Sequence, residues 1–240
     1  MKQFALWRPA AAVSLMSLLS CGGDLTLPNS PAAGLELAVV RGNDQTGTVG
    51  QALPEPVVVQ VSADEGTPMA GRRVIFVAAD GQDTGAFDPD TAITNSLGQA
   101  LTRWVLGTVP GVYAGEARVV AGGDTVVPTV PIQAAALAGD PDTLRALSPA
   151  SLPGRRNGTL EEPLVVIVLD RFGNPVEGAE VKWKVTAGGG VVSAEKDPTS
   201  VDGTSSVTWT LGNGIGVQKV AASVDGASGS PVTFTAIVLF

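Results

Sequence analysis

The chain has 240 residues, with 15 lysines and arginines against 23 aspartates and glutamates, no histidine and one cysteine, and its formal net charge is -8. Without histidine, and with a single thiol, it cannot form the usual zinc, copper or iron ligand sets, a Ser/His or Cys/His nucleophile pair, or an internal disulfide. The acidic balance also argues against nucleic acid as a partner, because that binding needs clustered Lys and Arg to replace counterions.

Residues 1–20 have the pattern of an export signal. Lys2 and Arg8 supply positive charge, and the apolar run at 9–19 is shorter than the roughly 20 residues that span a bilayer. Cys21 follows Leu-Leu-Ser and precedes Gly-Gly, and this segment resembles the lipobox of bacterial lipoproteins. The resemblance implies cleavage before Cys21 and a covalent lipid on it, and the alternative is an ordinary secretory signal with a chance cysteine.

The lipid would hold the mature protein on a membrane, because each buried methylene contributes about 0.8 kcal/mol and two or three acyl chains anchor almost permanently. The lipobox resemblance also implies the sorting rule of Gram-negative lipoproteins, in which an aspartate directly after the cysteine favours retention at the inner membrane. Here that position is Gly22, so we expect the outer membrane, with the side that the protein faces left open. Residues 21–34 are rich in Gly, Pro, Ser and Asn and are expected to form a flexible tether.

The rest of the chain is two copies of one unit. Residues 53–59 align with residues 160–166 without a gap, and residues 98–107 align with residues 203–212. The sequence therefore predicts two domains, at 35–137 and 142–240.

Apolar residues alternate with polar ones in each copy, which is the pattern of half-buried strands. In residues 180–185 the alternation directs Val181, Trp183 and Val185 toward a core, and the apolar run at 164–169 suits a central strand. Outside the signal no stretch shows helical periodicity. In the first copy, strands are expected near 35–41, 56–63, 73–79, 84–87, 99–106, 113–121 and 128–137.

About seven short strands in about 100 residues, separated by Gly, Pro, Asn and Asp, are typical of an immunoglobulin-like sandwich. The fold class is therefore predicted as all-β, with two tandem immunoglobulin-like β-sandwich domains after a lipoprotein signal peptide. The disulfide of antibody domains is absent, so packing alone must stabilise each core, with Trp104 and Trp209 at the two centres.

The second copy resembles a known family. Residues 170–183, Gly203 and residues 209–212 resemble the bacterial Ig-like domains of group 1, which are stacked in the stalks of invasin- and intimin-type adhesins. The first copy departs from the pattern, because it has Ala-Asp-Glu at 63–65 where the second has Asp-Arg-Phe at 170–172, and it is expected to be a divergent member. The resemblance implies a structural motif and no catalytic residue.

Four aspartates are the candidates for a metal ion. Asp88 and Asp90 lie with Asp80 and Asp83 in one loop region of the first copy, and Asp140 and Asp142 flank a proline at the junction. Oxygen ligands suit calcium, although none of these spacings reproduces a calcium-loop motif. The alternative is that all four are solvated turn residues and that the protein has no cofactor apart from the lipid.

One apolar pair is a candidate contact surface. Ile75 and Val77 occupy the face that Lys182 and Lys184 occupy in the second copy. Either a neighbouring loop or domain covers this apolar strip, or it binds a partner.

By analogy of fold, the sequence favours a membrane-anchored adhesion or interaction module at the cell surface, with a protein or glycan partner. Catalysis is not expected. A glycosidase would need two carboxylates in a cleft lined by aromatic residues, and aromatic residues are only 5% of the chain. One alternative is a structural or scaffolding lipoprotein that faces the periplasm. A second is an accessory carbohydrate-binding protein, which would need exposed aromatic residues, and its candidates are Tyr113, Phe87 and Phe172.

Overall fold

The computed structural model describes residues 34–79, 83–121 and 125–239. The predicted signal peptide at 1–20, the predicted lipid site Cys21 and the tether at 21–34, except Gly34, lie outside these residues. Within the described part of the chain, no helix is long and apolar enough to cross a membrane.

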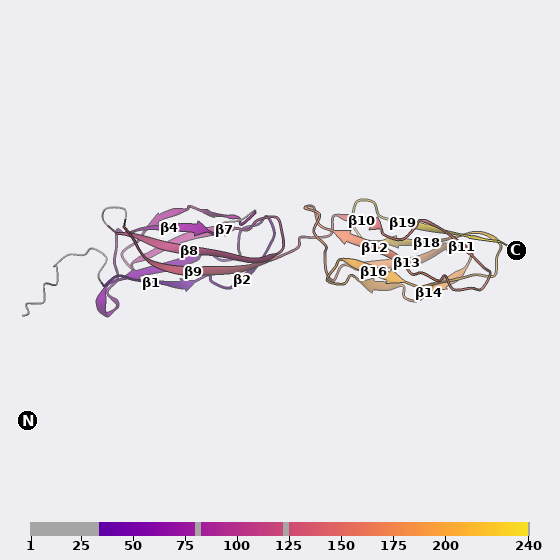
Figure 1. Ribbon diagram of the computed structural model, residues 1–240, viewed down its shortest axis with the longest axis horizontal. Helices are drawn as coiled ribbons and strands as arrows, with labels where there is room; N and C mark the ends of the chain where they lie inside the picture. Colours follow the sequence, from indigo (N-terminus) through magenta and orange to yellow (C-terminus); the bar gives the residue numbers. More distant parts are fainter. Residues whose placement is uncertain (1–33, 80–82, 122–124, 240) are drawn as a thin grey trace, which may run out of the picture.

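The chain forms two β-sandwiches placed end to end (Figure 1). We call residues 34–137 the N-terminal sandwich and residues 142–239 the C-terminal sandwich. The strands of each pair only with strands of the same sandwich. Among the described residues the one helical element is a short 3-10 turn, Asp64–Gly66, so the expectation of an all-β fold is confirmed.

In the N-terminal sandwich, one sheet has the strand order β1-β3-β7-β5 and the other has the order β2-β9-β8-β4-β6. The pairs are antiparallel except for β2 and β9, which run parallel. The strands are β1 (Glu36–Arg41), β2 (Gln45–Thr48), β3 (Val57–Ser62), β4 (Arg73–Ala78), β5 (Ala86–Asp88), β6 (Thr91–Ile93), β7 (Gln99–Val105), β8 (Gly111–Ala121) and β9 (Thr125–Leu137).

The C-terminal sandwich repeats this topology. One layer has the order β10-β12-β16 and is extended by the pair β14-β17, and the other has the order β11-β19-β18-β13-β15, with β11 and β19 parallel. The strands are β10 (Thr143–Ala146), β11 (Ser151–Gly154), β12 (Leu164–Leu169), β13 (Glu180–Ala187), β14 (Gly190–Val192), β15 (Lys196–Pro198), β16 (Thr204–Val207), β17 (Trp209–Leu211), β18 (Gly216–Ser223) and β19 (Val232–Val238).

The expected strands of the first copy are all present, with ends shifted by a few residues, and two further strands were missed. The first, β2, has the sequence Gln-Thr-Gly-Thr, which has no apolar alternation, and β6 has three residues. Both lie at the edges of their sheet, where pairing needs a strand on one side only. Such edge strands give little sequence signal because neither face has to be strongly apolar.

Each sandwich has its own apolar core, and each core is centred on the tryptophan that the sequence predicts. Trp104 and Trp209 are fully buried, at 0% exposure. The ring of Phe87 stacks on Trp104 with a centroid separation of 4.6 Å. In the second core Trp183 is also buried and its ring stacks on Phe234 at 5.9 Å. The alternation along these strands therefore directs their large rings inward.

Candidate functional site

The apolar pair Ile75 and Val77 lies on the outer face of the sheet that contains β4, β8 and β9. The neighbouring residues Val74 and Phe76 point into the core and are 0% and 2% exposed, whereas Ile75 and Val77 are half-buried. No element of the C-terminal sandwich pairs with β4, whose partners are β6 and β8. The strands beside Ile75 and Val77 therefore belong to the same sheet of the N-terminal sandwich.

This outer face is slightly hollow. A depression of about 650 Å³ lies beside Val77, and its lining includes the ion pair between Glu116 and Arg118. Val112, on the same face of β8, is 80% exposed. We call this surface the β4–β8–β9 face. The depression is lined by Val77, Ala78, Ala79, Ala114, Gly115, Glu116, Arg118, Thr129 and Pro131.

The corresponding face of the C-terminal sandwich is charged. Lys182 donates a hydrogen bond of 2.6 Å to Asp225, and this contact raises the pKa of the lysine. Lys184 is exposed. At these positions the two outer faces therefore differ, with half-buried apolar side chains in the N-terminal sandwich and lysines in the C-terminal one.

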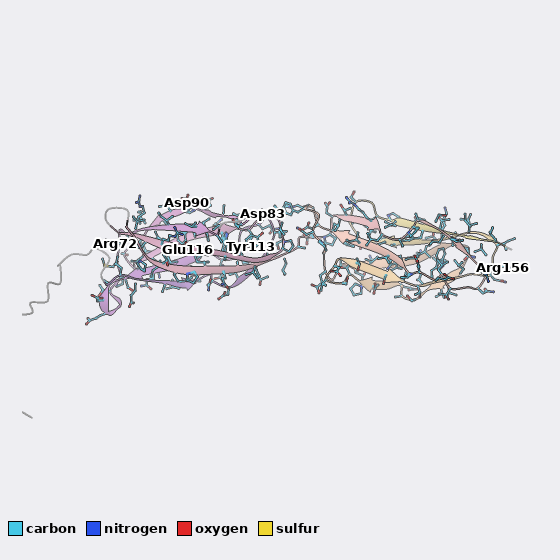
Figure 2. All side chains as sticks on the ribbon, in the orientation of Figure 1. Arg72, Asp83, Asp90, Tyr113, Glu116 and Arg156 are labelled. Carbon is cyan, nitrogen blue, oxygen red and sulfur yellow. The ribbon has the colours of Figure 1, made fainter. Side chains whose placement is uncertain are left out.

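The four aspartates proposed for calcium are not part of any group of three or more possible metal ligands among the described residues. Within the described ranges, no three His, Cys, Asp or Glu side chains are grouped so that they could hold a metal ion. Asp142 accepts a hydrogen bond from its neighbour Thr143 at 3.0 Å. Asp88 is the last residue of β5. Asp90 lies two residues later, away from the end of the N-terminal sandwich that faces the C-terminal one (Figure 2). The geometry gives Asp88, Asp90, Asp140 and Asp142 no common site.

Tyr113 is a candidate for sugar binding only if its ring is exposed, and the structure buries it. Its side chain is 7% exposed, its ring meets Trp104 edge-on at 6.3 Å, and its hydroxyl donates to the carbonyl oxygen of Val109 at 2.7 Å. Burial and the negative charge of Asp83 raise the pKa of the phenol. This is the tyrosine corner of immunoglobulin-like folds, which fastens the loop before a strand to that strand.

The carbohydrate alternative loses a second candidate in the same core. Phe87 is 7% exposed and stacks on Trp104, so it presents no ring to solvent. Phe172 is 39% exposed, but its ring lies under the guanidinium of Arg171, at 4.5 Å. The three aromatic residues named for sugar binding therefore do not form an exposed row.

One buried carboxylate that accepts four hydrogen bonds was not singled out from the sequence. Asp170 follows β12 and is 2% exposed. Its Oδ1 accepts hydrogen bonds from the backbone N–H groups of Phe172 (2.8 Å) and Asn174 (2.9 Å). Its Oδ2 accepts from the side chain of Asn174 and from the backbone N–H of Gly139, each at 2.9 Å. One carboxylate thus shapes the loop and ties it to the connection between the sandwiches.

These hydrogen bonds also set the ionisation of Asp170. Burial acts to raise the pKa of the carboxyl group, because it penalises the charged form, but the hydrogen bonds from Gly139, Asn174 and Phe172 outweigh it. The pKa therefore lies below its ordinary value of 3.8. Asp170 could have been singled out from the sequence, because the first copy has Ala63 at the aligned position.

The fold and these contacts define a pair of immunoglobulin-like sandwiches whose ordered polar groups serve structure. The model of the bacterial Ig-like domain (group 1) family matches residues 155–237, which lie in the C-terminal sandwich. This confirms the resemblance that the sequence shows in the second copy.

Solved structures with similar chains include three bacterial proteins. FdeC, an Escherichia coli adhesin, is 16% identical, with 87% of this chain and 65% of that chain covered and a TM-score of 0.52. InvD of Yersinia pseudotuberculosis is 18% identical, with 85% and 57% covered and a TM-score of 0.47. Invasin, a bacterial integrin-binding protein, is 26% identical, with 85% and 39% covered and a TM-score of 0.37. Comparison with curated protein sequences finds no relative.

Proposed function

We propose that the chain is a lipid-anchored outer-membrane protein whose two sandwiches are separate domains and act as an adhesion or interaction module at the cell surface. The observation that carries the proposal is the combination of a group 1 Ig-like domain with a lipobox-like segment at Cys21. The lipid supplies attachment, and the end-to-end sandwiches extend from it. The proposal assigns no catalytic residue.

Two further observations support this role. The sandwiches lie end to end, so the described part of the chain is elongated (Figure 1). FdeC, which has a similar fold, is an adhesin. An elongated, anchored pair of domains suits the display of a contact surface.

The contact surface that we propose is the β4–β8–β9 face, with a protein as the partner. The face combines the half-buried Ile75 and Val77 with Arg118 and Glu116, which lie opposite them on β8 and form an ion pair. With the exposed Val112 it offers both apolar and charged contacts, as protein interfaces do. A sugar would need stacking rings, and Tyr113 and Phe87 are in the core.

Protease treatment of intact cells tests the location. An antibody against the C-terminal sandwich should lose its signal when intact cells are treated, and a periplasmic marker protein should survive as the control for an unbroken outer membrane. Protection until the outer membrane is opened would refute surface display and favour the scaffolding role in the periplasm. In parallel, Cys21→Ser should move the protein from the membrane fraction to the soluble fraction, and unchanged fractionation would refute the lipid anchor.

Photo-crosslinking in living cells tests the face. A photoreactive phenylalanine analogue at Val77 should give an adduct with another protein, whereas the same analogue at Leu101 is the matched control. Leu101 is 57% exposed and lies on β7 in the opposite sheet. Equal adducts at both positions, or none at Val77, would contradict the assignment of the face.

A further inference from the structure

We infer that the loop at residues 170–175, which we call the docking loop, fastens the C-terminal sandwich to the end of the N-terminal sandwich, so that the two move as one body. The inference concerns the connection between the sandwiches and does not rest on the proposed function. It depends on three sets of contacts that meet at the junction.

A side-chain amide makes the first connection. The Nδ2 atom of Asn174 donates to the carbonyl oxygen of Thr108 in the N-terminal sandwich at 2.7 Å and to Oδ2 of Asp170 at 2.9 Å. Both of its hydrogens are therefore used, one in each sandwich. An amide held at two points by acceptors from different sandwiches restrains their relative rotation.

The acceptor in the N-terminal sandwich is itself held in place. The backbone N–H and the hydroxyl of Thr108 both donate to Oδ2 of Asp83, the hydroxyl at 2.7 Å. The side-chain hydrogen bond from Thr108 lowers the pKa of Asp83 below its ordinary value, which keeps this acceptor ionised. Figure 2 shows Asp83 at the end of the N-terminal sandwich that faces the C-terminal one. Hydrogen bonds thus run without a break from Asp83 through Thr108 and Asn174 to Asp170.

An aromatic contact makes the second connection. A Cβ atom added to Gly50 would lie 2.6 Å from Cζ of Phe172, so the ring lies directly against the backbone at this glycine. The backbone N–H of Gly50 donates to the carbonyl oxygen of Gly107 at 2.7 Å, which joins the two loops at this end of the N-terminal sandwich. The guanidinium of Arg171 covers the ring at 4.5 Å. The glycine leaves the space that the ring needs.

The connecting segment makes the third connection. The backbone N–H of Gly139 donates to Asp170, and the N–H of Asp142 donates to the carbonyl oxygen of Leu169 at 2.8 Å. A Cβ atom at Gly139 would lie 3.6 Å from Asp170 and 3.9 Å from the methyl group of Thr48. The segment is therefore bound at both ends to the C-terminal sandwich and passes close to the N-terminal one, which leaves little freedom for bending.

The loop at the aligned position of the N-terminal sandwich has none of this chemistry. Ala63, Glu65 and Thr67 stand where the C-terminal sandwich has Asp170, Phe172 and Asn174. Instead of a carboxylate-centred loop, this segment forms the 3-10 turn Asp64–Gly66. The side chains that contact the neighbouring sandwich thus occur only in the second of the two copies, which follows the N-terminal sandwich in the chain.

Distance measurements between two spin labels test the inference in the full chain. We would place the labels at Val112→Cys and Val217→Cys in a Cys21→Ser background, because these residues occupy aligned positions on β8 and β18 and are 80% and 54% exposed. The unmutated junction should give one narrow distance distribution. The double variant Phe172→Ala/Asn174→Ala should give a distribution at least about twice as wide.

Two controls keep the result interpretable. Thr67→Ala changes the residue aligned with Asn174 at the opposite end of the N-terminal sandwich and should leave the distribution unchanged. A circular dichroism melt of each variant shows whether both sandwiches are folded, and if the double variant does not fold, Asn174→Ala alone is measured and should also widen the distribution. A broad distribution in the unmutated junction, or an equally narrow one in a folded Phe172→Ala/Asn174→Ala or Asn174→Ala variant, would overturn the inference.

Discussion

The two sandwiches share one topology but use different side chains to stabilise it. In the N-terminal sandwich Tyr113 fastens the loop before β8 through its hydroxyl. In the C-terminal sandwich the aligned residue is Gln218, which is 1% exposed and whose amide bonds to both N–H and C=O of Gly212 and to the carbonyl oxygen of Gly214. The loop requires a buried hydrogen-bonding group, and either side chain supplies it.

The two cores differ in the same way. Phe76 and Ala100 of the N-terminal core correspond to Trp183 and Ser205 of the C-terminal core. The indole N–H of Trp183 donates to the hydroxyl of Ser205 at 3.0 Å, and that hydroxyl donates to Asp197 at 2.8 Å. A larger ring with a polar atom is accommodated because its partner changed from alanine to serine. The comparison teaches that the pattern of inward positions determines the fold, whereas local polar contacts can be exchanged in pairs.

The largest expected loss of stability comes from removing the central tryptophan, which each core has at the aligned position. Trp209→Ala should lower the free energy of unfolding of the C-terminal sandwich by about 3–5 kcal/mol, because it leaves a cavity in a closed core. Differential scanning calorimetry should show a lower melting temperature, whereas Val201→Ala, at a position that is 70% exposed, should change it little. A melting temperature unchanged by Trp209→Ala would show that this side chain does not support the core.

The polar pair of the C-terminal core gives the next effect. Ser205→Ala should cost about 1–3 kcal/mol, because it leaves the buried N–H of Trp183 without its partner. The double variant Trp183→Phe/Ser205→Ala recreates the pair Phe76/Ala100, and its cost should be smaller than the sum of the two single costs. Chemical denaturation of the four proteins measures the coupling, and strictly additive costs would contradict the paired exchange.

The corner residue of the N-terminal sandwich gives a smaller effect. Tyr113→Phe removes the hydroxyl that bonds to Val109 and keeps the ring against Trp104, so the cost should be about 0.5–1.5 kcal/mol. Urea unfolding followed by tryptophan fluorescence measures it. A cost near that of Trp209→Ala would mean that the ring, and not the hydrogen bond, has been disturbed.

The smallest expected effect is that of pH on the docking loop. The pKa of Asp170 is lower in the folded protein than in the unfolded chain, so its carboxylate stabilises the fold above the unfolded pKa, near 3.8. This contribution is lost as the pH falls through the lower folded pKa. When the pH is lowered below about 3.8, the melting temperature of the wild type should therefore fall more than that of Asp170→Asn. Equal falls in the two proteins would contradict the lowered pKa of Asp170.

Much of the fold could be predicted from the sequence because burial imposes a regular pattern on it. The alternation in β13 and the repeated tryptophans Trp104 and Trp209 gave the strands and both core centres. The edge strand β2 was missed, because its pairing with β9 uses backbone groups that any residue provides. Backbone pairing at an edge leaves little trace in composition.

The candidate sites were predicted less well. The outward direction of Ile75 and Val77 followed from the period of two, whereas the burial of Tyr113 could not be predicted, because its alternation with Val112 does not say which of the two faces inward. The role of Asp170 depends on atoms from residues that are far apart in the chain, such as the N–H of Gly139. A motif in the sequence can mark such a residue as structural, but only the folded structure shows which groups it hydrogen-bonds.

The most direct measurement of the central claim, that the two sandwiches form one rigid, elongated unit, is nitrogen-15 relaxation of the wild-type chain. The claim predicts that amides of both sandwiches fit a single, elongated rotational diffusion tensor, with the docking loop at residues 170–175 as ordered as the strands. Separate and shorter correlation times for residues 34–137 and 142–239, with a mobile loop between them, would contradict it.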